Sequence, residues 1–138
     1  MPLSLEIVTP DGVAWHDADV DSVTLPAKDG EIDILPGHVP LITILNAGMV
    51  EVSQKGHRQD LAIDRGYARC MGDVISVLTE AAIEVEHIDT QAAEEAQAQA
   101  LRALEEAKKQ KLDDSEIERL EAVARFALAQ LIAKGRHK

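Results

Sequence analysis

Apolar and polar residues alternate with a period of two between residues 3 and 86, in short runs that are separated by turn residues. The first run places Leu3, Leu5 and Ile7 between polar neighbours and ends at a Pro-Asp-Gly turn. A period of two puts successive apolar side chains on one face of a β-strand. Short runs of this kind, broken at regular intervals by turns, are typical of an antiparallel sandwich or barrel.

The later runs continue this pattern and contain two hairpins. Lys-Gly at residues 55–56 and Gly-Asp at residues 72–73 are the expected hairpin turns. The expected inward positions are Val23 and Leu25, Ile32 and Ile34, Val50 and Val52 facing Leu61 and Ile63, and finally Ile83 and Val85.

The period changes near Asp89. Residues 90–111 contain neither glycine nor proline and are rich in alanine, which predicts a helix. Asp113 followed by Glu116 has the spacing of a capping box and predicts a second helix, ending at Gly135. Because the connection is short, the two helices should be antiparallel. The sequence therefore predicts an α+β protein, with an antiparallel β-sandwich over residues 1–87 and a two-helix hairpin over residues 88–138.

Small residues on the first helix are expected to face larger ones on the second. The predicted seam consists of Ala93, Ala96, Ala100, Ala103 and Ala107 against Ile117, Leu120, Ala124, Ala127 and Leu131. A buried alanine methyl contributes only about 0.8 kcal/mol, against roughly 1.5–3 kcal/mol for a leucine or isoleucine. The hairpin should therefore dock marginally and be able to open, so its amides should exchange faster than those of the strands.

Composition and charge narrow the possible functions. The 138 residues suffice for one domain, or for a small domain with an appendage, and only three of them are aromatic. Few aromatic rings disfavour stacking on bases or sugars, and a net charge of −11 disfavours nucleic acid and anionic membranes. The charge is uneven: residues 1–88 carry 15 acids and 5 bases, whereas from residue 108 onward 8 bases face 5 acids. A positive C-terminal stretch could bind an acidic partner.

The residues that usually carry catalysis or bind metals are scattered. His16, His38, His57, His87 and His137 have no mutual ligand spacing, and common catalytic motifs are absent. Asp17, Asp19 and Asp21 match the start of a calcium loop, but Ser22 and Lys28 occupy the positions of its glycine and glutamate, so a solvated strand edge is the preferred interpretation. No metal site is expected.

Cysteine usage and the N-terminal residues favour a reducing compartment. Cys70 is the single cysteine, and its neighbours suggest a small apolar core residue without an activating base. The start, MPLSLEIV, lacks the features of a signal peptide, and no apolar stretch reaches membrane-spanning length. We therefore expect a soluble chain with neither independent catalysis nor membrane insertion.

One segment carries a specific family resemblance. LPAKDGEIDILPGHVPLIT, residues 25–43, is similar to the epsilon subunit of bacterial rotary ATP synthases, and the likeness extends over essentially the whole chain. That family joins a ten-stranded sandwich to a two-helix hairpin. Asp33 departs from the small residue common at its position. The resemblance implies c-ring contact for Glu31 and a gamma-subunit contact for His38, the alternative being a solvated acidic turn with a structural histidine.

The family's ATP-binding pattern, Ile-Asp-x-x-Arg-Ala, is matched in part. Ile88, Asp89 and Ala93 agree, but Ala92 stands at the arginine position. Without that guanidinium the bidentate phosphate contact is lost. Asp89 can then act as a helix N-cap, so no cofactor is expected and any ATP binding should be weak.

The resemblance implies a non-catalytic central-stalk subunit of a bacterial F-type ATP synthase, peripheral on the cytoplasmic face of the membrane. Its partners would be gamma, the c-ring and the alpha/beta catalytic head. The sandwich would couple ion translocation to ATP synthesis, and the helices would inhibit ATP hydrolysis. Candidate contacts to the head are Lys108, Lys109, Lys111, Arg119 and Arg125, each of which could instead belong to a solvated helix face. The rival functions are a stand-alone ATP-sensing module and a sandwich enzyme or carbohydrate binder.

Overall fold

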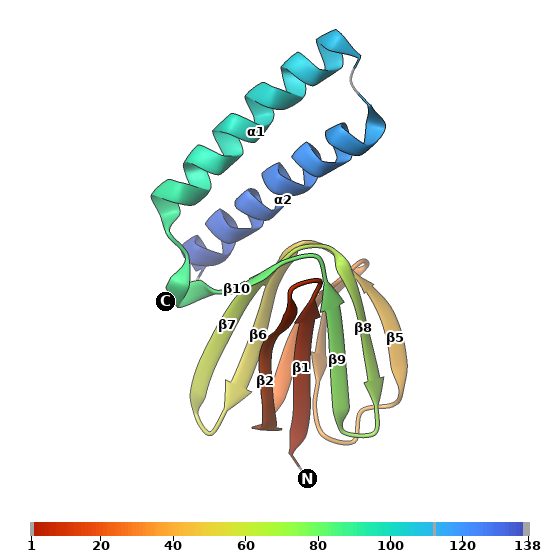
Figure 1. The fold of residues 1–138 in the computed structure, drawn as a ribbon. Helices are drawn as coiled ribbons and strands as arrows, with labels where there is room; N and C mark the ends of the chain where they lie inside the picture. The colour runs from red at the N-terminus through yellow and green to blue at the C-terminus, as the bar shows by residue number, and fades with distance from the viewer. Residues whose placement is uncertain (1, 112, 137–138) are drawn as a thin grey trace.

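The computed structural model describes residues 2–111 and 113–136 and contains a strand-rich part followed by two helices. The strands are β1 (Leu3–Thr9), β2 (Gly12–Val20), β3 (Ser22–Ala27), β4 (Gly30–Ile34), β5 (Leu41–Leu45), β6 (Gly48–Gln54), β7 (His57–Ile63), β8 (Gly66–Met71), β9 (Val74–Thr79) and β10 (Ala82–Glu84). A 3-10 turn, η1 (Val85–His87), leads into helices α1 (Thr90–Gln110) and α2 (Asp114–Arg136). The predicted fold class is confirmed (Figure 1).

The strands form two layers that meet at one corner. Hydrogen bonding gives the order β10-β7-β6-β3-β5-β8-β9-β1-β2, with β4 paired to the free side of β3. Strands β3 and β5 are joined only through Ala27 and Leu45, so the order divides there into β10-β7-β6-β3-β4 and β5-β8-β9-β1-β2. All neighbouring pairs are antiparallel except β1 and β9, which are parallel.

The core lies between the two layers and is almost entirely aliphatic. Alternate side chains of β1 are buried, and these are Leu3, Leu5 and Ile7, as the period of two predicts. The predicted inward positions of the other strands join them in one cluster: Val23, Leu25, Ile34, Val50, Val52, Leu61 and Ile63, with Ile32 packed at its margin. Since only Trp15 among the aromatic residues packs against this cluster, aliphatic burial stabilises the sandwich.

Capping interactions define both ends of helix α1. The Asp89 side chain caps it by accepting a hydrogen bond from the Ala92 N–H at 3.1 Å. Lys111, with a φ of 54°, takes the left-handed conformation that ends many helices, and its N–H donates to the Ala107 carbonyl. The predicted capping box of α2 is half formed, because Asp113 caps Ser115 while Glu116 pairs with Arg119 instead.

The seam between the two helices follows the predicted alanine stripe. Ala93, Ala100 and Ala107 of α1 are buried, together with Leu104, which the stripe did not include. On α2, Ala127 is buried, whereas the large seam residues are only partly buried: Ile117, Leu120 and Leu131. The fully buried side chains at the predicted seam are thus mainly alanines, and the marginal stability of the hairpin stays a prediction.

A second, smaller cluster joins the hairpin to the sandwich; we call it the interface cluster. It consists of Met49, Ala62, Val85, Ile88 and Ala133, with Ile83 and Phe126 packed against it. Val85 is buried and Ile83 is partly buried, but both face the hairpin rather than the sandwich core, because β10 is a short edge strand from which the chain turns outward. In Figure 1 the hairpin stands at one end of the sandwich, with α2 nearer the strands than α1, and the N-terminus lies at the opposite end. Helix α2 contacts β6, β7 and η1.

Candidate interaction surfaces

The outer side of strands β5, β8 and β9 carries an unusual concentration of exposed apolar side chains; we call it the apolar face. It consists of Ile42, Ile44, Tyr67, Met71, Val74 and Leu78. Ile42 is 73% exposed and Ile44 58% exposed, although both belong to a strand whose final leucine is fully buried. Isolated exposed apolar residues are common, but a contiguous group of them marks an interaction site.

Strand register aligns five of these side chains in two groups; the sixth, Ile42, lies opposite Arg69, which is paired with Ser76. Ile44 lies opposite Tyr67, which in turn lies opposite Leu78, so three large side chains form a row across the strands. Met71 and Val74 form a second pair near the β8–β9 turn. Directly opposed side chains on one face of a sheet are in contact range. The arrangement can therefore bind an apolar partner surface.

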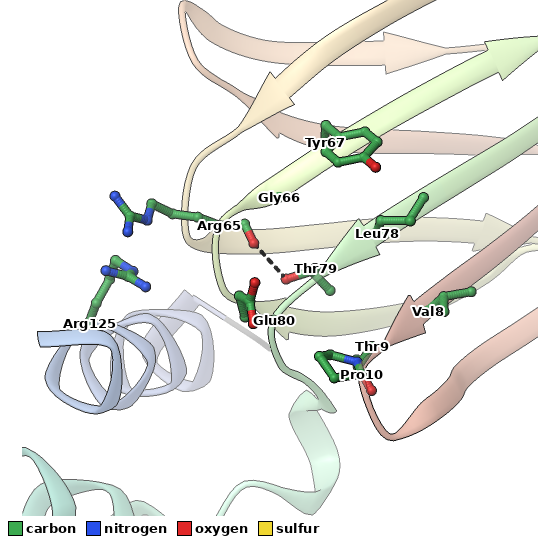
Figure 2. Close-up of a pocket in the computed structure, with 10 residues that line it drawn as sticks. All are labelled: Val8, Thr9, Pro10, Arg65, Gly66, Tyr67, Leu78, Thr79, Glu80 and Arg125. Atoms are coloured by element: carbon green, nitrogen blue, oxygen red, sulfur yellow. Dashed lines mark hydrogen bonds between the residues drawn. The ribbon is translucent and has the colours of Figure 1, made fainter. Parts of the chain in front are cut away.

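A pocket of about 590 Å³ lies at the end of the apolar face nearest the hairpin (Figure 2). Its lining residues are Val8, Thr9, Pro10, Arg65, Gly66, Tyr67, Leu78, Thr79, Glu80 and Arg125. Figure 2 shows the side chains of Arg65 and Arg125 at one end and Val8 and Pro10 at the other. Tyr67 and Leu78 belong to both the pocket and the apolar face, so the two features form one surface that extends to helix α2.

One ion pair connects α2 to the sandwich next to this pocket. Arg125 Nε donates to Asp64 Oδ1 at 2.6 Å and Nη2 donates to Oδ2 at 3.1 Å, a two-pronged contact. The Asp64 side chain is only 3% exposed and that of Arg125 is 25% exposed. Arg125, predicted from sequence as a contact to another subunit, thus pairs within the chain in this arrangement, and Asp64 was not among the predicted residues.

The two residues predicted for rotor contacts lie at opposite ends of β4. Glu31 follows the β3–β4 turn, and its carboxylate is 3.8 Å from Arg136 Nη2 of α2. His38 lies beyond the other end of the strand, where its Nδ1 is 2.8 Å from the Val39 carbonyl oxygen. The adjacent Gly37 N–H donates to Asp73 in the β8–β9 turn. The structure therefore does not bring Glu31 and His38 together, and any contacts that they make are separate ones.

The partial nucleotide motif has a structural role in this arrangement. Ile88 is buried in the interface cluster, and the carboxylate of Asp89 caps α1. Ala92 is exposed and provides no cation. Ile88 and Asp89 therefore stabilise the junction between the sandwich and the hairpin.

The predicted basic stretch divides into two places. Lys108, Lys109 and Lys111 are exposed at the C-terminal end of α1, and within the described residues they form no ion pair. Arg119 is also exposed and pairs with Glu116 one helical turn away at 2.9 Å. Four of the five predicted bases thus lie at or near the tip of the hairpin, and Arg125 lies midway along α2, where it contacts Asp64 of the sandwich.

The acidic run on β2 is held by hydrogen bonds and an ion pair. The Gln54 side chain and then the Asp19 N–H lower the pKa of Asp17 by hydrogen bonding. Asp19 pairs with Lys55 Nζ at 3.0 Å, and Asp21 accepts from the Lys55 N–H. In the described part of the chain no three His, Cys, Asp or Glu side chains are placed to hold a metal ion. His137 lies outside the described residues.

Cys70 provides a direct test of the core. It is fully buried on β8 within the sandwich core, and desolvation raises the pKa of its thiol. Because the thiolate is the reactive species, we expect Cys70 to react far more slowly with a disulfide reagent in the native protein than in denaturant at the same pH. Equal rates, followed by absorbance of the released thiolate, would contradict the burial of this side chain.

The sequence carried a signal for the apolar face that the period-two interpretation overlooked. Strand β5 reads LITIL, with apolar residues at four of its five positions, so both of its faces are apolar. A strand with one solvated face should instead alternate. No comparable signal identifies Asp64, because its partner on α2 is 61 residues away in sequence.

Comparison with known proteins agrees with this architecture. The family described as ATP synthase, Delta/Epsilon chain, beta-sandwich domain matches residues 2–85. The ATP synthase epsilon chain of Bacillus velezensis is 32% identical over 133 residues, covering 96% of this chain and 97% of the relative. That of Bdellovibrio bacteriovorus is 43% identical over 96 residues, covering 68% and 69%.

Solved structures share the fold. A chain in the cryo-EM structure of the Euglena gracilis mitochondrial ATP synthase, OSCP/F1/c-ring, matches with a TM-score of 0.72 and 23% identity, covering 96% of this chain and 81% of that one. The family match over the whole sandwich and the relative that matches through both helices lead to one conclusion. This chain belongs to the ATP synthase delta/epsilon family, as an epsilon chain of the bacterial type.

Proposed function

We propose that the protein is a non-catalytic subunit of the rotating central stalk of a bacterial F-type ATP synthase, binding gamma, the c-ring and, through its helices, the alpha/beta catalytic head. The apolar face is the observation that carries this proposal. Six large side chains left exposed on three adjacent strands need a partner surface, and a stalk subunit has one in gamma. The sandwich then acts as the rigid coupling between the c-ring and gamma during ion-driven ATP synthesis.

The hairpin is the regulatory part in this proposal. It is joined to the sandwich by a small interface cluster and by one buried ion pair, and its tip presents Lys108, Lys109, Lys111 and Arg119 to solvent. A pair of helices that leaves the sandwich can place these bases against acidic surface of the catalytic head. Each exposed pair contributes at most about 1 kcal/mol, so several must act together to restrain hydrolysis.

The proposed location is peripheral, on the cytoplasmic face of the bacterial membrane. Within the described residues no helix combines the length and apolar character needed to cross a bilayer. We propose that no cofactor is required and that ATP binds weakly, since Asp89 is occupied as a cap and Ala92 lacks charge. Glu31 and His38 remain our proposed contacts to the c-ring and gamma, at separate places on the sandwich.

Removing residues 90–138 from the assembled synthase tests the regulatory part. The sandwich core contains no residue of either helix, so we expect coupled ATP synthesis to persist. ATP hydrolysis by the same complexes should rise, because the helices that we propose to inhibit it are absent. The measurement is synthesis and hydrolysis in membranes that contain equal amounts of synthase. Unchanged hydrolysis would remove the brake from the proposal while leaving the coupling role intact.

A further inference from the structure

The geometry of the Asp64–Arg125 ion pair favours the arrangement in which the hairpin is docked on the sandwich. Hydrogen bonds within the sandwich position Asp64 independently of Arg125. The Asp64 N–H donates to the Ala81 carbonyl at 2.9 Å, and the Asp64 carbonyl accepts from the Thr79 hydroxyl at 2.7 Å. Its Oδ1 also accepts from the Arg65 N–H at 2.7 Å. A carboxylate held in place in this way fits the planar fork of a guanidinium, whereas a lysine ammonium could occupy only a single point of it.

Few other contacts attach α2 to the sandwich. Ala129 and Ala133 are small, Phe126 is partly buried, and the half-exposed Arg136 lies 3.8 Å from Glu31 and 3.9 Å from Glu51. Lys134 donates one hydrogen bond to the Val85 carbonyl at 3.2 Å. Because exposed ion pairs contribute little, the buried Asp64–Arg125 pair is the main polar contact that favours the docked hairpin.

Arg125 also belongs to the net positive stretch that we propose for binding the catalytic head. Its Nε and Nη2 are engaged by Asp64 on the sandwich, so a hairpin that carries Arg125 to a carboxylate of the catalytic head must first break the contact with Asp64. The strongly acidic sandwich therefore competes with any acidic partner for this side chain. With the hairpin docked the Asp64 side chain is only 3% exposed, so opening breaks a charge-assisted contact that is shielded from water, and this opposes opening.

We propose that Asp64 competes with an acidic group of the catalytic head for Arg125. Asp64 pairs with Arg125 while the hairpin is docked, and Arg125 exchanges Asp64 for the acidic group of the head when the hairpin opens. The inference rests on the proposed function, because it assigns the regulation of that hairpin to one pair of residues. It makes different predictions for the two partners of the pair, which a merely structural ion pair would not do.

The first experiment uses the free full-length protein and hydrogen exchange of the α2 amides between Ala127 and Ala133. Asp64→Asn and Arg125→Gln should each raise their exchange rates by about tenfold or more, since either change breaks the ion pair. Asp19→Asn is the matched control, because it removes the same charge and an ion pair to Lys55 without touching the hairpin. Unchanged exchange in both test variants would overturn the proposal.

Hydrolysis by the assembled synthase separates competition from simple loosening. With Asp64→Asn, Arg125 is set free and hydrolysis should be restrained more than in the wild type. With Arg125→Gln, the hairpin is equally loose but lacks the guanidinium, so restraint should not increase. If the two variants change hydrolysis alike, competition is wrong even if the hairpin opens. Failure of the proposed brake appears separately, as unchanged hydrolysis when residues 90–138 are removed.

Protection of the strand amides of β8 and β9 serves as the folding check for Asp64→Asn. If that variant loses strand protection, Arg125→Gln decides the first experiment alone, since Arg125 belongs to α2 and the sandwich core cluster contains no residue of either helix. If the α2 amides of Arg125→Gln then exchange at the wild-type rate, the proposal that the Asp64–Arg125 pair holds the hairpin against the sandwich is wrong.

Discussion

Replacing Gly66 with alanine is expected to lower the free energy of unfolding by about 3 kcal/mol or more, the upper end for inserting an atom into a packed site. A Cβ at this position would lie 1.9 Å from the Leu78 carbonyl oxygen and 2.8 Å from Thr79 Cα. Both obstacles are backbone atoms of the paired strand β9, so neither can move without separating β8 from β9. Denaturant unfolding of the two proteins, followed by circular dichroism, measures the difference.

The Gly66→Ala clash should also weaken the contact between the sandwich and the hairpin. Thr79 is the direct partner of Gly66, and its hydroxyl lies within hydrogen-bonding distance of the carbonyls of Asp64, Arg65 and Ala81. Moving Thr79 would therefore displace Asp64 and weaken its contact with Arg125. Gly135→Ala is the control, because a Cβ there meets nothing within 4 Å and alanine favours a helix by about 1 kcal/mol. A Gly66→Ala protein as stable as the wild type would show that the strands are not as close as described.

The elements were predictable because local pattern decides them. Alternation placed Leu3, Leu5 and Ile7 in the core, and alanine content with an N-cap aspartate fixed helix α1. These features depend on side-chain period, propensity and capping, which act over a few residues. The hairpin seam was also predictable, since residues spaced by three and four share a helix face.

Contacts between distant segments were not predictable in the same way. The pair of Asp64 and Arg125 spans 61 residues, and its geometry depends on how the hairpin meets the sandwich. Ile83 and Val85 show the same limit, because alternation predicted that both point inward but could not show that they pack against the hairpin. Glu31 and His38, seven residues apart, were assigned from one motif, although Glu31 lies at the start of β4 and His38 lies beyond the end of that strand.

Charging the apolar face is expected to have the largest effect on function. We predict that Ile44→Asp weakens binding of the isolated protein to gamma by about 100-fold or more, because an unpaired charge buried in an interface costs about 3 kcal/mol or more. Ile44 is 58% exposed in the free protein, so folding should be nearly unaffected. Titration of immobilised gamma with the wild type and the variant gives the affinities, and thermal unfolding verifies the fold.

The control for this variant is Leu101→Asp, which introduces the same charge at a half-exposed leucine of α1, on the hairpin and away from the apolar face. If gamma binds through β5, β8 and β9, the Leu101 variant keeps wild-type affinity and the Ile44 variant does not. Equal loss in both would indicate general repulsion by an already acidic protein rather than a contact at Ile44. Wild-type affinity in both would mean that gamma binds elsewhere. The row of Ile44, Tyr67 and Leu78 would then require a different partner, since its exposure is a property of the fold and not of the complex.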